Sequence, residues 1–264
     1  MTTARTKRVA AFDNEAALCA AFIDAATKQN RWTGDGARWR AYPETGGFDI
    51  VMVRIADGVQ IGIEAKLRLN EDVMRQAAED HHSVLIPGPD YRAVLVPDGA
   101  GRESLGWVAP FLGLTVIRAR TMDDGSLHYW PDLPAHDYVG NSHWHDNLPA
   151  TRIRLPDYVP DVQAGKSAPV KLTPWKVAAL KIAVLVETRG FVTRADFKHV
   201  QIDHRRWVAM QWLSVEAERR VWVKGSHWPD FRAQHPVNFE QIAADIEAWK
   251  PVDLAMPAVQ GGLL

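Results

Sequence analysis

The segment that most constrains the fold of this 264-residue chain spans residues 48–69, where two apolar, β-branched runs flank Asp57-Gly58. An Asp-Gly dipeptide is typical of a two-residue type I′ turn, so it predicts a β-hairpin in which Ala56 pairs with Val59. Both runs are apolar at odd and at even positions. Strands of this kind are buried on both faces, so we expect the hairpin at the centre of a sheet that helices cover on both sides.

The predicted pairing brings three charged side chains together at one end of the hairpin. Asp49 is expected opposite Lys66. Glu64, which lies two residues before Lys66, is expected opposite Val51. Cross-strand partners share a face, and so do residues two apart on one strand, so the three charged residues lie on one face with the two carboxylates on a diagonal. Diagonal neighbours lie about 7–8 Å apart, near enough for both carboxylates to hold one cation. A structural salt bridge, in which the lysine neutralises both acids, is the alternative.

Periodicity predicts further elements on either side of this hairpin. An alanine-rich stretch with apolar residues at helical spacing predicts a helix over residues 14–28. Residues 31–47 form a turn-rich stretch. After the hairpin, the pattern predicts a helix over residues 70–82 and strands over residues 91–96 and 114–117.

The order of these elements and acidic residues resembles the PD-(D/E)xK nuclease superfamily. Its motif is matched by Gly47-Phe48-Asp49 before the turn, by Glu64-Ala65-Lys66 after it, and by Glu15 on the first helix. Gln76 matches the glutamine that exonuclease-like members carry on the second helix, whereas the proline of the family name has no counterpart. The resemblance covers roughly residues 10–120. It implies an α/β domain with the restriction-endonuclease-like fold, a mixed sheet flanked by helices.

The resemblance also implies a catalytic site for phosphodiester hydrolysis. Asp49 and Glu64 would hold Mg²⁺, or Mn²⁺ in its place, as hard cations prefer carboxylate oxygens. Lys66 would orient or deprotonate the attacking water and stabilise the negative transition state. Glu15 is the expected third metal ligand, with Glu44 as its competitor.

The formal charge of the chain, 31 Lys+Arg against 32 Asp+Glu, is −1, but the two signs are unevenly distributed. Residues 170–232 contain 12 Lys+Arg and 6 Asp+Glu, a net of +6, whereas residues 1–169 contain 18 against 22, a net of −4. Frequent prolines between residues 132 and 174 are typical of a linker. We therefore expect a nuclease-like domain over 1–130, a proline-rich linker or arm over 131–169, a second domain over 170–250 and a flexible tail over 251–264.

The basic second domain carries the start signals of three helices. Thr173, Thr193 and Asp203 are suitable N-cap residues, and a proline or a capping-box acid follows the first two. The first helix is expected to end before Gly190, and the third is expected over residues 203–213.

A short hairpin, or wing, is expected after these helices over residues 219–224, with a turn at Gly225-Ser226. Three helices followed by a wing resemble a winged helix-turn-helix domain, which places the start of its third helix in the major groove of DNA. The expected DNA contacts are His204, Arg205 and Arg206 in the groove, with Lys198, Arg219, Arg220 and Lys224 on phosphates. A helical domain that binds another protein is the alternative.

The remaining features restrict compartment and partners. A single cysteine, Cys19, excludes an internal disulfide framework and a thiolate metal cluster. The sequence shows neither a signal peptide nor an apolar run long enough to span a membrane, so a cytoplasmic protein without a membrane partner is expected. A homodimer is compatible with these features.

These features together predict a Mg²⁺-dependent deoxyribonuclease that a winged-helix module delivers to DNA. Two alternatives stay open. One is a non-catalytic DNA-binding or regulatory protein on a degenerate nuclease fold. The other is a nuclease of the same fold that acts on RNA.

Overall fold

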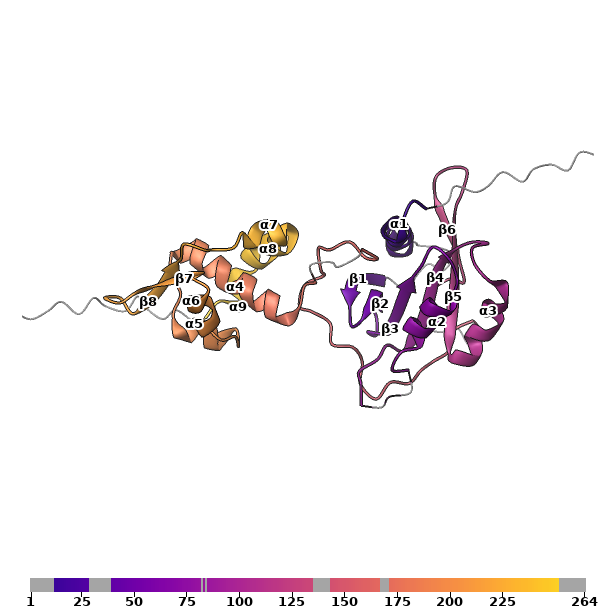
Figure 1. Cartoon of the computed structure of the whole chain (residues 1–264), viewed down its shortest axis with the longest axis horizontal. Helices are drawn as coiled ribbons and strands as arrows, with labels where there is room; N and C mark the ends of the chain where they lie inside the picture. Colours follow the sequence, from indigo (N-terminus) through magenta and orange to yellow (C-terminus); the bar gives the residue numbers. More distant parts are fainter. Residues whose placement is uncertain are drawn as a thin grey trace, which may run out of the picture. The chain divides into compact units, whose positions relative to one another are not determined.

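The chain divides into two compact units, which are described separately from a computed structural model (Figure 1). Unit 1 comprises residues 1–155 and 162–171, and unit 2 comprises residues 156–161 and 172–264. The structure describes residues 12–28, 39–81, 83, 85–134, 143–166 and 171–251. Apart from Pro251, the expected flexible tail lies outside the described residues.

Unit 1 is a mixed α/β unit built on a six-stranded sheet with the strand order β1-β2-β3-β4-β5-β6. Strands β1 to β3 are antiparallel, β3 to β5 are parallel, and β6 is antiparallel to β5. The strands are β1 (Trp39–Thr45), β2 (Phe48–Arg54), β3 (Gln60–Ala65), β4 (Tyr91–Pro97), β5 (Leu114–Thr121) and β6 (Leu127–Trp130). The helices are α1 (Glu15–Lys28), α2 (Glu71–Ala78), α3 (Glu103–Val108) and the 3-10 helix η1 (Ala109–Leu112).

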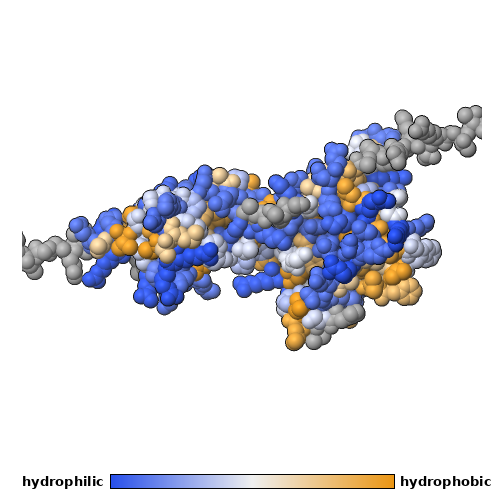
Figure 2. Space-filling view, in the orientation of Figure 1, coloured by the Kyte–Doolittle hydropathy of each residue, from blue (hydrophilic) through white to orange (hydrophobic). Residues whose placement is uncertain are grey.

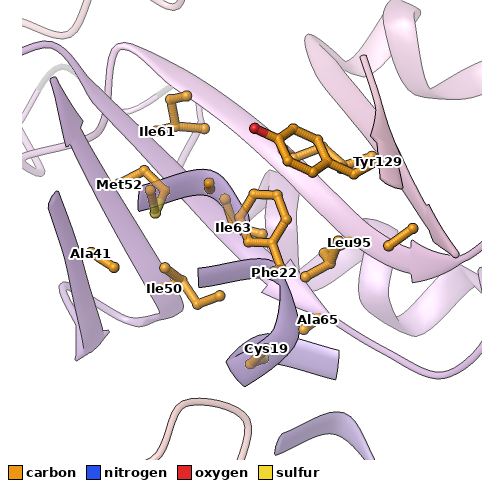
Figure 3. Packing of buried hydrophobic residues seen from close by; sticks show 14 of the residues in the cluster. Cys19, Phe22, Ala41, Ile50, Met52, Ile61, Ile63, Ala65, Leu95 and Tyr129 are labelled. Carbon is orange, nitrogen blue, oxygen red and sulfur yellow. The ribbon is translucent and has the colours of Figure 1, made fainter. Parts of the chain in front are cut away.

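Helices cover both faces of this sheet, as the doubly apolar hairpin predicted. On one face, Phe22 and Cys19 of α1 pack against Ile50 and Ile63 of the central strands (Figure 3). On the other face, residues of α2 and η1 form a second cluster with β4 and β5, of which Val73, Ala77, Val94 and Leu114 are fully buried. The predicted helix over 14–28 and the predicted strands that became β4 and β5 are confirmed.

Strands β2 and β3 form the predicted hairpin, but the predicted register is wrong by two residues. Val51 pairs with Gly62 rather than with Glu64. Continued by one step beyond its last pair, the ladder places Asp49 directly opposite Glu64 rather than opposite Lys66. A shift of two residues preserves which side chains share a face, so the two carboxylates stay neighbours and come closer than the predicted diagonal.

The turn explains the shift in register. The backbone N–H of Arg54 donates to the carbonyl of Val59 at 2.8 Å, so the loop between them has four residues instead of two. Gly58 has a positive φ of +72°, but Asp57 does not, and a type I′ turn needs positive φ at both positions. Asp57 instead accepts bonds from Nε and Nη2 of Arg54 at 2.8 and 2.7 Å. This ion pair holds the longer loop in place.

Two segments that were predicted as a turn-rich stretch and as a linker or arm contribute to the sheet and the core of unit 1. The turn-rich stretch over 31–47 contains strand β1, which tolerates Pro43 because β1 is at the edge of the sheet. The proline-rich segment has no helix or strand in its described residues 131–134 and 143–166, yet Trp144 and Ala164 belong to the main core of unit 1. Unit 1 therefore extends beyond residue 130.

Unit 2 is a helical unit with one two-stranded hairpin in its described residues. Its elements are α4 (Pro174–Arg189), α5 (Arg194–His199), α6 (Arg205–Ala209), β7 (Leu213–Glu216), β8 (Val221–Lys224), α7 (Phe231–Gln234), α8 (Pro236–Ala244) and α9 (Ile246–Trp249). The predicted caps are confirmed at two helices. Thr173 Oγ1 accepts the N–H of Lys176, and Thr193 forms a capping box with Asp196. Gly190 ends α4 with φ +82°, a conformation that favours glycine.

The third predicted helix and the predicted wing turn both need correction. Helix α6 ends at Ala209, because Gln211 adopts φ +56° and Leu213 already begins strand β7. The hairpin turn lies between β7 and β8 at residues 217–220 rather than at Gly225-Ser226. Within the predicted wing, residues 221–224 therefore form β8, the second strand of the hairpin.

Apolar side chains gather on the surface of unit 1 over α3 and η1, as Figure 2 shows. Trp107 and Phe111 are 76% and 89% exposed there. Within the described part of the chain, no helix is long and apolar enough to cross a membrane.

Candidate functional site

The two candidate carboxylates of unit 1 lie where strands β2 and β3 separate. The β2–β3 ladder ends at the pair Ile50 and Ile63, one step before Asp49 and Glu64. Beyond it, the backbone N–H of Ala65 donates to Oδ2 of Asp49 at 2.8 Å. A side-chain carboxylate thus replaces the backbone partner at the point where the hairpin opens. This bond orients Asp49 from the strand that carries Glu64.

Both carboxylates resist ionisation. Glu64 is only 9% exposed, and burial together with the negative charge of Asp49 raises its pKa to about 8. Burial also raises the pKa of Asp49, although the Ala65 N–H and the Lys66 ammonium act in the opposite direction. Each acid is therefore destabilised as an anion by its surroundings, and a nearby positive charge would favour the ionised form of both.

Lys66 links this pair to helix α1. Its Nζ lies 3.1 Å from Oε2 of Glu15, the first residue of α1, and each side chain is about one third exposed. Burial lowers the pKa of Lys66, but the hydrogen bond to Glu15 and the charges of Asp49 and Glu64 outweigh it and raise the pKa overall. The structure thus brings Glu15 to the site, where it holds the ammonium of Lys66.

Glu44 also lies close enough to raise the pKa of Glu64, and its own oxygens already have partners. Oε1 accepts the backbone N–H of Gly165 at 3.0 Å, and Oε2 lies 3.7 Å from Nζ of Lys171. Burial first, and the charge of Asp49 second, raise the pKa of Glu44. Sequence reasoning missed Gly165 and Lys171, because both lie more than 120 residues from Glu44 and carry no local motif.

Gln76 lies on helix α2, which packs against strands β3 and β4. Its side chain is partly buried, and Oε1 is buried without a hydrogen-bond partner. A buried amide oxygen without a partner is costly, so it marks a position where water or a ligand is expected.

The carboxylate pair has the donor chemistry for a hard divalent cation. Among the described residues, no group of three or more His, Cys, Asp and Glu side chains could hold a metal ion. Asp49 and Glu64 form a set of two, since the other two acids are paired with lysines. Mg²⁺ usually binds proteins through one or two carboxylates and completes its shell with water and substrate phosphate oxygens. A set of two fits that pattern.

The basic candidates of unit 2 fall into two groups. Lys198, His204 and Arg205 line one groove of about 800 Å³ together with Arg194. His204 is packed rather than free, because its ring stacks on Trp222 at a centroid distance of 4.6 Å. Lys198 and Arg205 are exposed on the groove. The groove therefore presents Arg194, Lys198 and Arg205 as exposed basic side chains.

Arg205 is partly neutralised by its neighbour Asp203. Nη2 of Arg205 lies 2.7 Å from Oδ2 of Asp203, and hydrogen bonds from Arg205 lower the pKa of Asp203 to about 2. Arg206 is exposed on α6. Both arginines begin the helix, as predicted, although the helix is short.

The second group lies on the hairpin of β7 and β8. Arg220 is exposed in its turn, and Lys224 is exposed at the end of β8 with its ammonium 5.7 Å from the ring centroid of Trp228. Arg219 is partly buried and pairs with Glu216 at 3.3 Å. Arg219 therefore has less freedom to reach a phosphate than the other two.

The structure brings four of the unit 1 candidates together through a hydrogen bond, an ion pair or mutual effects on their pKa values: Asp49, Glu64, Lys66 and Glu15. Gln76 lies on helix α2, which packs against strand β3. Comparisons of the chain with protein-family models, with curated proteins and with solved structures found no match.

Proposed function

We propose that this chain is a metal-dependent nuclease that hydrolyses phosphodiester bonds of DNA. The observation that carries the proposal is the pair of buried carboxylates, Asp49 and Glu64, beside the ammonium of Lys66 at the open end of the β2–β3 hairpin. Burying two acids side by side destabilises a fold, so this arrangement favours a site whose positive charge arrives with a ligand. The element order of unit 1 also agrees with a restriction-endonuclease-like fold.

Each side chain then has a defined task. When bound, Mg²⁺ would neutralise phosphoryl charge and lower the pKa of a water, and Asp49 and Glu64 would hold it. The Ala65 N–H fixes the orientation of Asp49. Glu15 keeps Lys66 protonated and positioned, so that its ammonium can stabilise negative charge on the phosphate.

Unit 2 would supply DNA binding. A helix, a short bridge between Val192 and Trp222, two more helices and a hairpin follow one another, an order that supports a winged-helix domain. Exposed Lys198 on α5, and exposed Arg205 and Arg206 at the start of α6, would meet phosphates and base edges. The net charge of +6 over residues 170–232 supports this role.

The test is cleavage by the purified full-length chain. Plasmid, linear duplex and single-stranded DNA, and RNA, are incubated with Mg²⁺, with Mn²⁺ or with EDTA. We expect metal-dependent cleavage of DNA that Glu64→Ala and Lys66→Ala abolish, while the control Glu71→Ala, an exposed acid on α2, cleaves normally.

The outcomes separate the proposal from its alternatives. Cleavage that persists in both site variants would refute the proposed site. Cleavage confined to RNA would assign the same chemistry to an RNA-directed enzyme. DNA binding without any cleavage would favour a regulatory protein, an alternative that the lysine pairing of Glu15 and Glu44 supports.

A further inference from the structure

Unit 2 contains a second concave site, separate from the basic groove. It is a pocket of about 240 Å³ between helices α4 and α7. Its aromatic walls come from Trp175, Trp212 and Phe231, and its polar groups come from Lys176, Gln234 and His235. Trp175 and Gln234 are exposed at the pocket, whereas Phe231 and His235 are buried.

His235 is held rigidly in this pocket. Its side chain is 1% exposed, and its Nδ1 lies 2.7 Å from Oδ1 of Asp161. The other carboxylate oxygen of Asp161 accepts the backbone N–H groups of Val237 and Asn238 at 3.0 and 3.1 Å. Asn238 Oδ1 accepts the N–H of Asp161 in return at 3.0 Å. The imidazole therefore has one fixed orientation, set by a buried network.

The other ring nitrogen of His235, Nε2, is buried without a hydrogen-bond partner. The indole N–H of Trp207, which stacks on the pocket residue Phe231, is also buried without a partner. A buried polar group without a partner lowers the stability of a folded protein, because it has lost its hydrogen bonds to water. A rigid imidazole with an unused nitrogen in an aromatic pocket is a feature that a polar, flat ligand would explain.

We propose that this pocket binds one unstacked nucleobase of a nucleic-acid strand. Aromatic walls bind the face of any base by stacking. Gln234 and His235 offer donor and acceptor groups for the base edge, and Lys176 offers a cation for the strand. The pocket is smaller than the roughly 300–1,000 Å³ of sites for drug-sized ligands, which suits a single ring system.

The alternative occupant, an apolar side chain of a protein partner, fits less well. It would leave the unused nitrogen of His235 and the ammonium of Lys176 without polar partners in a covered pocket. The inference rests on the proposed nucleic-acid binding of unit 2, and the base pocket adds a preference for unpaired or single-stranded segments.

The experiment uses the full-length chain in EDTA with a 12-nucleotide single-stranded DNA that contains one 2-aminopurine, and with its RNA counterpart. Binding is followed by the fluorescence of 2-aminopurine and by the indole N–H resonances of the tryptophans. We expect binding of the wild type to change the fluorescence and to shift the Trp175 resonance. Trp175→Ala and Gln234→Ala should each weaken binding about tenfold and remove most of the fluorescence change.

Matched variants control this experiment. Trp107→Ala, in an exposed patch of unit 1, should bind as the wild type does, and Trp175→Phe, which retains an aromatic face, should keep most of the signal. Fluorescence changes in Trp175→Ala and Gln234→Ala that are as large as those of the wild type would overturn the pocket assignment. Glu64-dependent DNA cleavage without any 2-aminopurine signal would overturn it and leave the proposed function intact. Absence of both cleavage and binding would overturn both.

Discussion

Replacing Glu64 by Gln is expected to stabilise unit 1 at neutral pH when no metal is present. Glu64 is 9% exposed and has a pKa of about 8 against an ordinary value of 4.5. At pH 7 the acid ionises in the unfolded chain, and this ionisation stabilises the unfolded state. In the folded chain the acid stays mostly protonated, so the folded state gains little. The difference destabilises the fold by about 3 kcal/mol, and a neutral amide of the same shape removes it.

The sign of the pH dependence follows from the raised pKa. The folded state binds the proton more tightly than the unfolded state, so the penalty is absent below about pH 4.5. It grows as the pH rises towards 8 and is constant above that value. Wild-type stability should therefore fall between pH 4.5 and pH 8, and the Glu64→Gln variant should lose this part of the decline.

Hydrogen exchange of the full-length chain in EDTA measures this effect in unit 1 alone, through peptides that cover strands β2 and β3. Relative to the wild type, Glu64→Gln is expected to exchange about 300-fold more slowly at pH 7 and only about fourfold more slowly at pH 5. The control Glu71→Gln, an exposed acid on α2, should match the wild type. Equal exchange of wild type and variant at pH 7, or equal gains at both pH values, would refute the reasoning.

Three further substitutions test other parts of the structure. Gly62→Ala should cost unit 1 about 1–3 kcal/mol in urea unfolding, because the new methyl group would lie 2.7 Å from the Phe48 ring. Arg54→Met should cost about 3 kcal/mol in the same assay, since it removes the guanidinium bonds to the Asp57 carboxylate and to the Pro134 carbonyl, and an unchanged midpoint would contradict this. Asp203→Asn should raise duplex DNA affinity about threefold in fluorescence anisotropy, because Arg205 loses its ion-pair partner, and weaker binding would argue against the groove.

Local sequence signals were reliable wherever neighbouring residues decide the structure. The Thr193–Asp196 capping box and Gly190 at the end of α4 appear as predicted, because caps depend on residues within one turn. Helix α1 and strand β4 also follow from their own periodicity. The apolar pattern of the hairpin correctly placed it at the centre of a covered sheet.

Predictions were wrong where a distant residue decides the outcome. Asp57-Gly58 suits several turns, and the four-residue loop is held by Arg54, which also donates to the carbonyl of Pro134 eighty residues away. Strand β1 looks turn-rich in sequence and is a strand because the edge of the sheet accepts Pro43. The Arg54–Asp57 pair lies within the turn itself, but the contact of Arg54 with Pro134 and the edge position of β1 have no local signal.

In the candidate site, too, some features follow from the sequence and others depend on tertiary contacts. The sequence alone determined which residues carry its charge, because Asp49, Glu64 and Lys66 follow from alternation along two strands, and a two-residue error in register preserves that alternation. Only the tertiary structure decided how these charges are paired. The contacts of Lys66 with Glu15 and of Glu44 with Lys171 join segments 51 and 127 residues apart. Such contacts depend on packing, in which burial and charge from the whole unit set the protonation of each acid.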